Sequence, residues 1–76
     1  MVLQRLEQVR TRMVNAQLDA LLISSSANRR WLTGFSGSAG SVIIGQDCAF
    51  LLVDARYVTQ AKDQAPQFEI IEYVDF

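Results

Sequence analysis

The sequence predicts an α/β fold in which a mixed β-sheet is flanked by helices, in the order αβαββαβ. An N-terminal stretch repeats its apolar residues with helical spacing, and short apolar runs further along have the length of strands. Two of these runs are joined by a tight turn, which indicates a hairpin. The other strands are separated by helical segments and are expected to run parallel, so the sheet is mixed.

The first predicted helix covers residues 2–15, because apolar side chains recur on one face at spacings of four and three. That face comprises Val2, Leu6, Val9, Met13 and Ala16. The compact apolar run over residues 18–23 follows, and its length and composition predict a strand buried on both faces.

A short second helix is predicted over residues 27–33. The serines at positions 24, 25 and 26 supply turn chemistry and an N-cap for it. Gly34 comes directly after it, where a left-handed residue commonly ends a helix.

The hairpin is predicted from strands over residues 41–44 and 48–53, joined by Gly-Gln-Asp at positions 45 to 47. Asp54 is placed to cap a third helix over residues 55–64, and Pro66 lies just past its end. Residues 68–74 form the last predicted strand.

Composition narrows the class of protein. Half of the 76 residues are apolar, which is enough for a packed core, and the net charge is only −1. That balance argues against a surface that binds nucleic acid or membrane, and we expect neither as a partner.

The single cysteine, Cys48, cannot form an intrachain disulfide, and no apolar run approaches the roughly 20 residues of a membrane span. We therefore expect a cytoplasmic protein, with Cys48 as an inert thiol at the head of a buried strand.

The glycines at positions 34, 37 and 40 invite comparison with phosphate-binding loops. Their spacing is Gly-x-x-Gly-x-x-Gly between a helix and a strand, whereas the dinucleotide motif is Gly-x-Gly-x-x-Gly between a strand and a helix. The nucleoside-triphosphate motif fails as well, because Ser41 and Val42 follow the last glycine. The chain has no histidine to activate the serines of this segment, so serine hydrolase chemistry is rejected and no catalytic residue is assigned. The favoured interpretation is a helix cap and a close backbone approach, with the loop serines as hydrogen-bonding groups.

Three aromatic or cationic side chains near this loop are candidates for a role beyond packing, namely Arg56, Tyr57 and Trp31. Arg56 falls in the first turn of its predicted helix, where a cation is unfavourable, so a carboxylate partner or a function is expected for it. Of these two roles for Arg56, a structural salt bridge with a carboxylate is favoured over a function. Tyr57 is expected to pack between helix and sheet with its hydroxyl at the edge. Trp31 fits either the core or the lip of a pocket.

Three segments together resemble the N-terminal domain of Xaa-Pro aminopeptidases and prolidases, the creatinase/prolidase N-terminal domain. Residues 18–23 read Leu-Asp-Ala-Leu-Leu-Ile, residues 28–40 read Asn-Arg-Arg-Trp-Leu-Thr-Gly-Phe-Ser-Gly-Ser-Ala-Gly, and residues 51–57 read Leu-Leu-Val-Asp-Ala-Arg-Tyr. The chain departs from the family at Ala55, where glycine is common, and at Gln17, where the family usually has glycine. Glutamine is less favourable than glycine at the end of a helix, so Gln17 is expected to make a less favourable helix terminus.

The resemblance implies a non-catalytic domain that precedes a "pita-bread" metallopeptidase domain. The implied parent is a hydrolase that cleaves the bond preceding proline with two divalent metal ions, manganese or zinc, held by a catalytic domain absent from residues 1–76. This segment would be the N-terminal part of a truncated domain. Its implied roles are assembly into a dimer or tetramer and control of substrate access. We name Trp31, Phe35 and Arg56 as candidates for the substrate-pocket or interface contacts, and no metal ligand.

Two alternatives stay open from the sequence. A pseudo-peptidase module that binds proteins as a chaperone shares this fold, and so does creatinase. Sequence downstream of the segment distinguishes them, because the metal-ligand set Asp, Asp, His, Glu, Glu indicates an enzyme and its loss indicates a binding protein.

Overall fold

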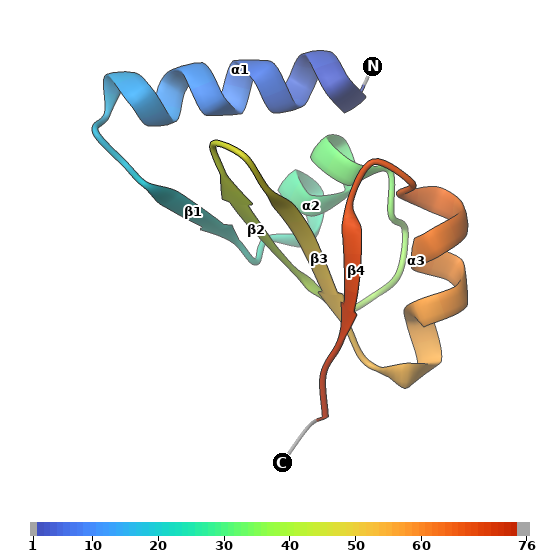
Figure 1. The fold of residues 1–76 in the computed structure, drawn as a ribbon. Helices are drawn as coiled ribbons and strands as arrows, with labels where there is room; N and C mark the ends of the chain where they lie inside the picture. Colours follow the sequence, from blue (N-terminus) through green and yellow to red (C-terminus); the bar gives the residue numbers. More distant parts are fainter. Residues whose placement is uncertain (1, 75–76) are drawn as a thin grey trace.

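The computed structural model describes residues 2–74, which form one four-stranded sheet with its helices (Figure 1). The element order within these residues confirms the prediction, with one 3-10 helix added before the last α-helix. The elements are α1 Val2–Asn15, β1 Ala20–Ile23, α2 Ser26–Thr33, β2 Ser41–Gly45, β3 Ala49–Val53, η1 Ala55–Tyr57, α3 Val58–Gln64 and β4 Glu69–Glu72. No helix within residues 2–74 combines the length and the apolar character needed to cross a membrane.

The sheet is mixed, as predicted, with strand order β1-β2-β3-β4. The predicted hairpin is present, since β2 and β3 pair antiparallel, and β4 lies parallel to β3 after the crossover through η1 and α3. The expectation of a parallel arrangement across α2 is wrong, because β1 and β2 pair antiparallel.

The segment between α2 and β2 explains that difference. Eight residues of helix advance by about 12 Å, at roughly 1.5 Å per residue. The segment after Gly34 has no helix and returns the chain over a similar length, so β2 begins beside the end of β1, with Ile23 opposite Val42. A strand that starts where its neighbour ends must run in the opposite direction.

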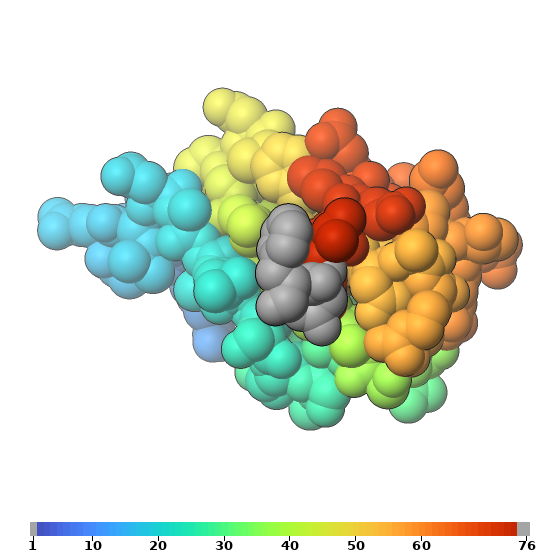
Figure 2. All heavy atoms as spheres, turned by 90° about the horizontal axis from the view of Figure 1, so that it is seen from below, coloured from blue at the N-terminus to red at the C-terminus, as the bar shows by residue number. Residues whose placement is uncertain are grey.

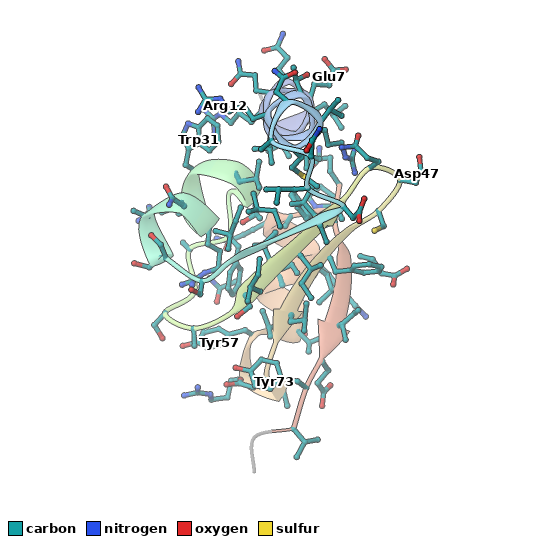
Figure 3. The ribbon with its side chains drawn as sticks, turned by 90° about the vertical axis from the view of Figure 1, so that its left-hand side faces the viewer. Glu7, Arg12, Trp31, Asp47, Tyr57 and Tyr73 are labelled. Carbon is teal, nitrogen blue, oxygen red and sulfur yellow. The ribbon has the colours of Figure 1, made fainter. Side chains whose placement is uncertain are left out.

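The core lies on one face of the sheet. Strand residues Val42, Ile44, Leu51 and Val53 are fully buried there, beneath side chains from the helices. The helices contribute Leu6 and Met13 from α1, Leu32 from α2 and Ala61 from α3. Figure 3, which views the sheet close to its edge, shows α2 on this side and no helix on the opposite side.

Strand β1 is an edge strand, which corrects the prediction that residues 18–23 are buried on both faces. Leu21 and Ile23 pack against the core, whereas Leu22 is 64% exposed and Leu18 is 44% exposed. Its apolar run resembles that of a fully buried strand because the second sheet face also carries apolar side chains.

Helix α1 ends in a left-handed turn at Gln17, with φ of 59°. The Gln17 amide donates to the Val14 carbonyl at 3.0 Å and the Leu18 amide donates to the Met13 carbonyl at 2.8 Å. This is the Schellman arrangement, in which glycine is the usual residue. The structure therefore confirms the prediction that Gln17 is a less favourable helix terminus than glycine would be.

Cys48 corrects a second prediction, because it is exposed rather than buried. Strand β3 begins one residue later, at Ala49, and Cys48 belongs to the turn that joins β2 to β3. Its carbonyl accepts from the Gly45 amide at 3.0 Å and from Arg10 Nη2 of α1 at 3.0 Å. The backbone of this turn is thus held, while the thiol faces outward.

Candidate functional site

The segment from residue 34 to residue 40, called here the glycine loop, begins at the end of α2. Ser25 caps the start of that helix by accepting from the Asn28 amide at 3.4 Å. Gly34 ends the helix with φ of 81°, and its amide donates to the Arg30 carbonyl at 2.9 Å. Both caps confirm the sequence prediction.

Arg29 holds the glycine loop from beneath. Its side chain is only 3% exposed, and its guanidinium donates from Nη1 to the Gly40 carbonyl at 2.9 Å and from Nη2 to the Gly37 carbonyl at 3.0 Å. Its Nε has no hydrogen-bond partner among the described residues. A buried cation that binds two backbone carbonyls fixes the path of a segment that has no regular structure of its own.

Thr33 continues this bracing at the start of the loop. Its Oγ1 donates to the Arg29 carbonyl at 2.8 Å and accepts from the Phe35 amide at 2.9 Å. Arg29, Thr33 and Phe35 are all buried. The Thr33 hydroxyl therefore forms hydrogen bonds with a backbone carbonyl and a backbone amide that water cannot reach.

Phe35 is fully buried and lies edge-on to Tyr57, with ring centroids 5.8 Å apart and planes at 83°. Gly37 makes room for it, because a Cβ at that position would lie 2.2 Å from Phe35 Cζ. The Tyr57 hydroxyl is hydrogen-bonded to the Ser38 hydroxyl at the exposed side of the loop. The Tyr57 hydroxyl lies at the edge, as predicted, and the Tyr57 ring packs against the core beside Phe35 of the loop.

A second polar contact joins the loop to α3. The Ser36 amide donates to Gln64 Oε1 at 2.9 Å, and Gln60 Nε2 donates to Ser36 Oγ at 3.2 Å. Figure 2 shows the resulting surface, where the yellow-green glycine loop lies beside the orange segment that follows β3. Serines of the loop are therefore hydrogen-bonding groups, as predicted for Ser36 and Ser38.

Arg56 has the carboxylate partner that its position predicted. Its Nη2 lies 2.7 Å from Asp54 Oδ2, and Asp54 Oδ1 also accepts from the Arg56 amide at 2.9 Å, capping η1. The hydrogen bond from the Arg56 side chain lowers the pKa of Asp54 from its ordinary value, and the same bond raises the pKa of Arg56. Arg56 also lies over the Tyr57 ring, 5.1 Å from its centroid. The Arg56 side chain nevertheless remains 71% exposed, which leaves its outer face accessible.

Trp31 lies on the surface, where it is 46% exposed on α2 beside α1 (Figure 3). The Arg5 guanidinium lies 5.3 Å from the ring centroid, and its Nη1 donates to the Trp31 carbonyl at 2.6 Å. The indole borders a groove of about 420 Å³ between α1, β1 and α2, which Val9, Leu21 and Leu22 also line. Of the two positions that the sequence allowed, the structure places Trp31 at the lip of a pocket.

The three predicted contact residues are therefore not brought together. Phe35 and Arg56 both contact Tyr57, whereas Trp31 belongs to the separate groove between α1 and α2. Sequence reasoning missed Arg29, to which it assigned no role. The signal was present in its spacing, because Arg29 falls three and four residues before the buried Leu32 and Thr33 on one helix face.

The chemistry of these groups is hydrogen bonding and ion pairing. Hydroxyl, amide and guanidinium groups at the surface suit the binding of carboxylates, carbonyls and peptide backbones. Within residues 2–74 no group of three or more His, Cys, Asp or Glu side chains is placed to hold a metal ion. The two metal ions implied by the resemblance therefore do not fit the side chains described here.

A family model described as the Creatinase/Prolidase N-terminal domain matches residues 5–76. The chain is 45% identical over 69 residues to the uncharacterized peptidase YqhT of Bacillus subtilis (strain 168), covering 91% of the chain and 20% of that protein. Its structure resembles an Xaa-Pro dipeptidase from Bacillus anthracis, with a TM-score of 0.94 and 32% identity, over 100% of this chain and 21% of that one.

A shorter solved structure is also similar, the N-terminal domain of the cytoplasmic peptidase PepQ from Mycobacterium tuberculosis H37Rv. The TM-score is 0.88 at 39% identity, over 92% of this chain and 55% of that domain. Further relatives carry the name putative Xaa-Pro aminopeptidase. The chain thus spans about a fifth of the full-length relatives and little more than half of an isolated N-terminal domain.

Proposed function

The chain belongs to the creatinase/prolidase N-terminal domain family, and on that premise we propose that it serves as the N-terminal part of a metal-dependent Xaa-Pro peptidase. The observation that carries this proposal is the match over residues 5–76 together with relatives named as Xaa-Pro peptidases. The resemblance stated from the three sequence segments is confirmed at the level of the family.

In this proposal the parent protein hydrolyses the bond that precedes proline in a peptide, in the cytoplasm. The chemistry belongs to a catalytic domain outside residues 1–76, where two divalent metal ions, manganese or zinc, would activate water. The present segment contributes binding and positioning groups. A relative described as a cytoplasmic peptidase supports the proposed location.

We assign this domain to assembly of a dimer or tetramer and to restriction of access to the catalytic centre. The support is the arrangement of its accessible groups. Trp31 and Arg56 have exposed side chains that neighbouring residues hold in place, through Arg5 and Asp54 respectively. Ordered aromatic and arginine side chains lose little conformational freedom on binding, which suits contacts with a second subunit or a peptide. Phe35 is buried, so its contribution acts through the position of Tyr57.

The test uses the parent protein with its natural downstream sequence. With Mn²⁺ present, we expect hydrolysis of an Xaa-Pro dipeptide or of a longer Xaa-Pro peptide, and no hydrolysis of creatine. Loss of activity toward all Xaa-Pro substrates in a folded, metal-loaded parent would reject the enzyme assignment. Hydrolysis of creatine alone would identify a creatinase, and a folded parent that fails to bind metal would identify a binding protein.

The role of this domain is tested separately with Trp31→Ala and Arg56→Ala in the parent. We expect either variant to weaken subunit association or to change the preference for peptide length, while the rate on the shortest substrate changes less. Lys62→Ala, which removes an exposed cation from α3, is the matched control for Arg56. Unchanged sedimentation and an unchanged length preference in both variants would count against these contacts.

A further inference from the structure

A groove of about 560 Å³ lies between helix α2 and the glycine loop. Ser26, Ala27 and Arg30 of α2 form one wall, and residues 35–38 of the loop form the other. Neither wall carries an acidic side chain, and the Arg30 side chain is exposed. This groove shares no lining residue with the one that Trp31 borders. Its polar groups are therefore hydroxyls, backbone groups and a single cation.

The buried Arg29 side chain fixes the direction in which the loop presents one of its amides. Its Nη2 donates to the Gly37 carbonyl at 3.0 Å. In a trans peptide group the carbonyl and the following N–H point in opposite directions, and residues 2–74 contain no cis peptide bond. The Ser38 amide therefore points away from the buried guanidinium, and it has no acceptor among residues 2–74. It is a donor held in a fixed orientation at the wall of the groove.

The positive charge beside the groove is not neutralised by the described residues. Neither Arg29 nor Arg30 lies within ion-pair distance of a carboxylate in residues 2–74, where Arg56 and Asp54 form the only such pair. Arg29 is 3% exposed, and its Nε has no hydrogen-bond partner there either. The start of α2, which also lines the groove, adds the positive end of a helix dipole. A buried cation without a counter-ion is costly, so an anion in the groove would stabilise this arrangement.

The number of donors and charges matches a carboxylate better than a phosphate. A carboxylate has two oxygens and one negative charge, which a guanidinium and a backbone amide satisfy together. A phosphate group carries nearly two negative charges near neutral pH, whereas Arg30 is the single cation that lines the groove.

We propose that the groove between α2 and the glycine loop binds the carboxylate of a peptide, with the Arg30 guanidinium and the Ser38 amide as donors. The assignment of a peptide as the ligand rests on the proposed function. The site lies apart from the exposed side chains of Trp31 and Arg56, neither of which lines this groove.

The test is the binding of two labelled peptides to the full-length parent, measured by fluorescence anisotropy. Both peptides have the same short sequence without proline or acidic residues and a dye at the N-terminus. One ends in a free carboxylate and the other in a carboxamide. Arg30→Gln removes the guanidinium from the groove, and Arg12→Gln, which removes an exposed arginine from α1, is the matched control. The two substitutions change the net charge equally.

We expect the wild type to bind the carboxylate peptide about tenfold more tightly than the carboxamide peptide. Arg12→Gln should keep that ratio, and Arg30→Gln should bring it within about threefold of unity. The proposal is overturned by equal binding of the two peptides to the wild type, by a ratio that survives Arg30→Gln, or by an equal loss in Arg12→Gln.

A competition experiment checks the class of anion. We expect acetate to displace the carboxylate peptide from the wild type at a lower concentration than inorganic phosphate does. The opposite order would overturn the assignment of a carboxylate. Because the peptides contain no proline, these results stand whether or not the parent hydrolyses Xaa-Pro peptides.

Discussion

Residues 2–74 contain two strand–helix–strand units that have the same order of elements but differ in the direction of their second strand. In the first unit, β1 is followed by α2, the glycine loop and β2, and the two strands are antiparallel. In the second, β3 is followed by η1, α3 and β4, and the strands are parallel. The helices are of similar length, so helix content does not decide the direction of the second strand.

The difference lies in the segment after the helix. The second unit needs only the short connection after Gln64 to enter β4, whereas the first returns along its helix through the glycine loop. That return segment is held by Arg29 from one side and by Tyr57 and Gln64 of the second unit from the other. The loop therefore accounts for the antiparallel pairing, and it joins the two units at a second place besides the ladder between β2 and β3.

The largest effect is expected where the glycine loop passes over the core. Gly37→Ala would place a Cβ 2.2 Å from the ring of Phe35, which is fully buried and packs on Tyr57. We expect a loss of about 2 kcal/mol or more in the free energy of unfolding. In the control Gly45→Ala the nearest atom is the sulfur of the exposed Cys48, which rotates away, so the loss stays below about 1 kcal/mol. Urea unfolding followed by circular dichroism measures both, and equal losses would contradict the tight contact at Gly37.

The next effect separates two adjacent arginines of α2. Arg29→Met leaves the carbonyls of Gly37 and Gly40 without their donor, so we expect a loss of about 2 kcal/mol. Arg30→Met removes an exposed cation from the same helix and should change stability by less than about 0.5 kcal/mol. Amide hydrogen exchange across the loop adds a local reading, with faster exchange expected only in Arg29→Met. Similar results for the two variants would reject the bracing role of Arg29.

Substitutions at the ends of α1 and α2 are expected to change the free energy of unfolding in opposite directions. Gln17 adopts a left-handed conformation with a side chain, and Gly34 adopts one without. Gln17→Gly should therefore raise the free energy of unfolding by about 0.5 to 1 kcal/mol, and Gly34→Ala should lower it by about 1 kcal/mol. The midpoints of urea unfolding should move in opposite directions, and shifts of the same sign would contradict this account.

The smallest effect concerns pH and the start of the second unit. The hydrogen bond from Arg56 lowers the pKa of Asp54 in the folded chain. The contribution of this bond to stability is therefore fully present when the pH is above 3.8, the ordinary pKa of the carboxyl. It is lost as the pH falls through the lowered pKa. The difference in urea midpoint between the wild type and Asp54→Asn should therefore shrink between pH 7 and pH 3. A difference in urea midpoint that grows toward low pH would contradict the lowered pKa of Asp54.

Local signals in the sequence predicted most of the fold. Helix periodicity, the serine and glycine caps and the hairpin turn each depend on neighbours in the chain. The structure has the first helix and the caps where predicted, and the turn lies one residue later than predicted, at positions 46 to 48. The direction of β2 and the exposure of β1 depend on contacts between distant residues. Arg29 to Gly40 is one such contact, and a pattern read along one segment does not contain it.

The candidate site shows the same division. The pairing of Arg56 with a carboxylate followed from its position at a helix start, and Asp54 is only two residues away. The burial of Phe35 followed from its contact with Tyr57, twenty-two positions along the chain, and was not predicted. Whether Trp31 and Arg56 contact a neighbouring subunit stays a prediction for the parent protein.

The position of Trp31 has a practical consequence. It is the single tryptophan of the chain, and it is half-exposed at the lip of the groove between α1 and α2. A partner that covers this groove would remove water from the indole and shift its fluorescence emission to shorter wavelength. The unmodified segment thus carries its own optical reporter for whatever docks there, and titration with a catalytic domain or a peptide can be followed without a label.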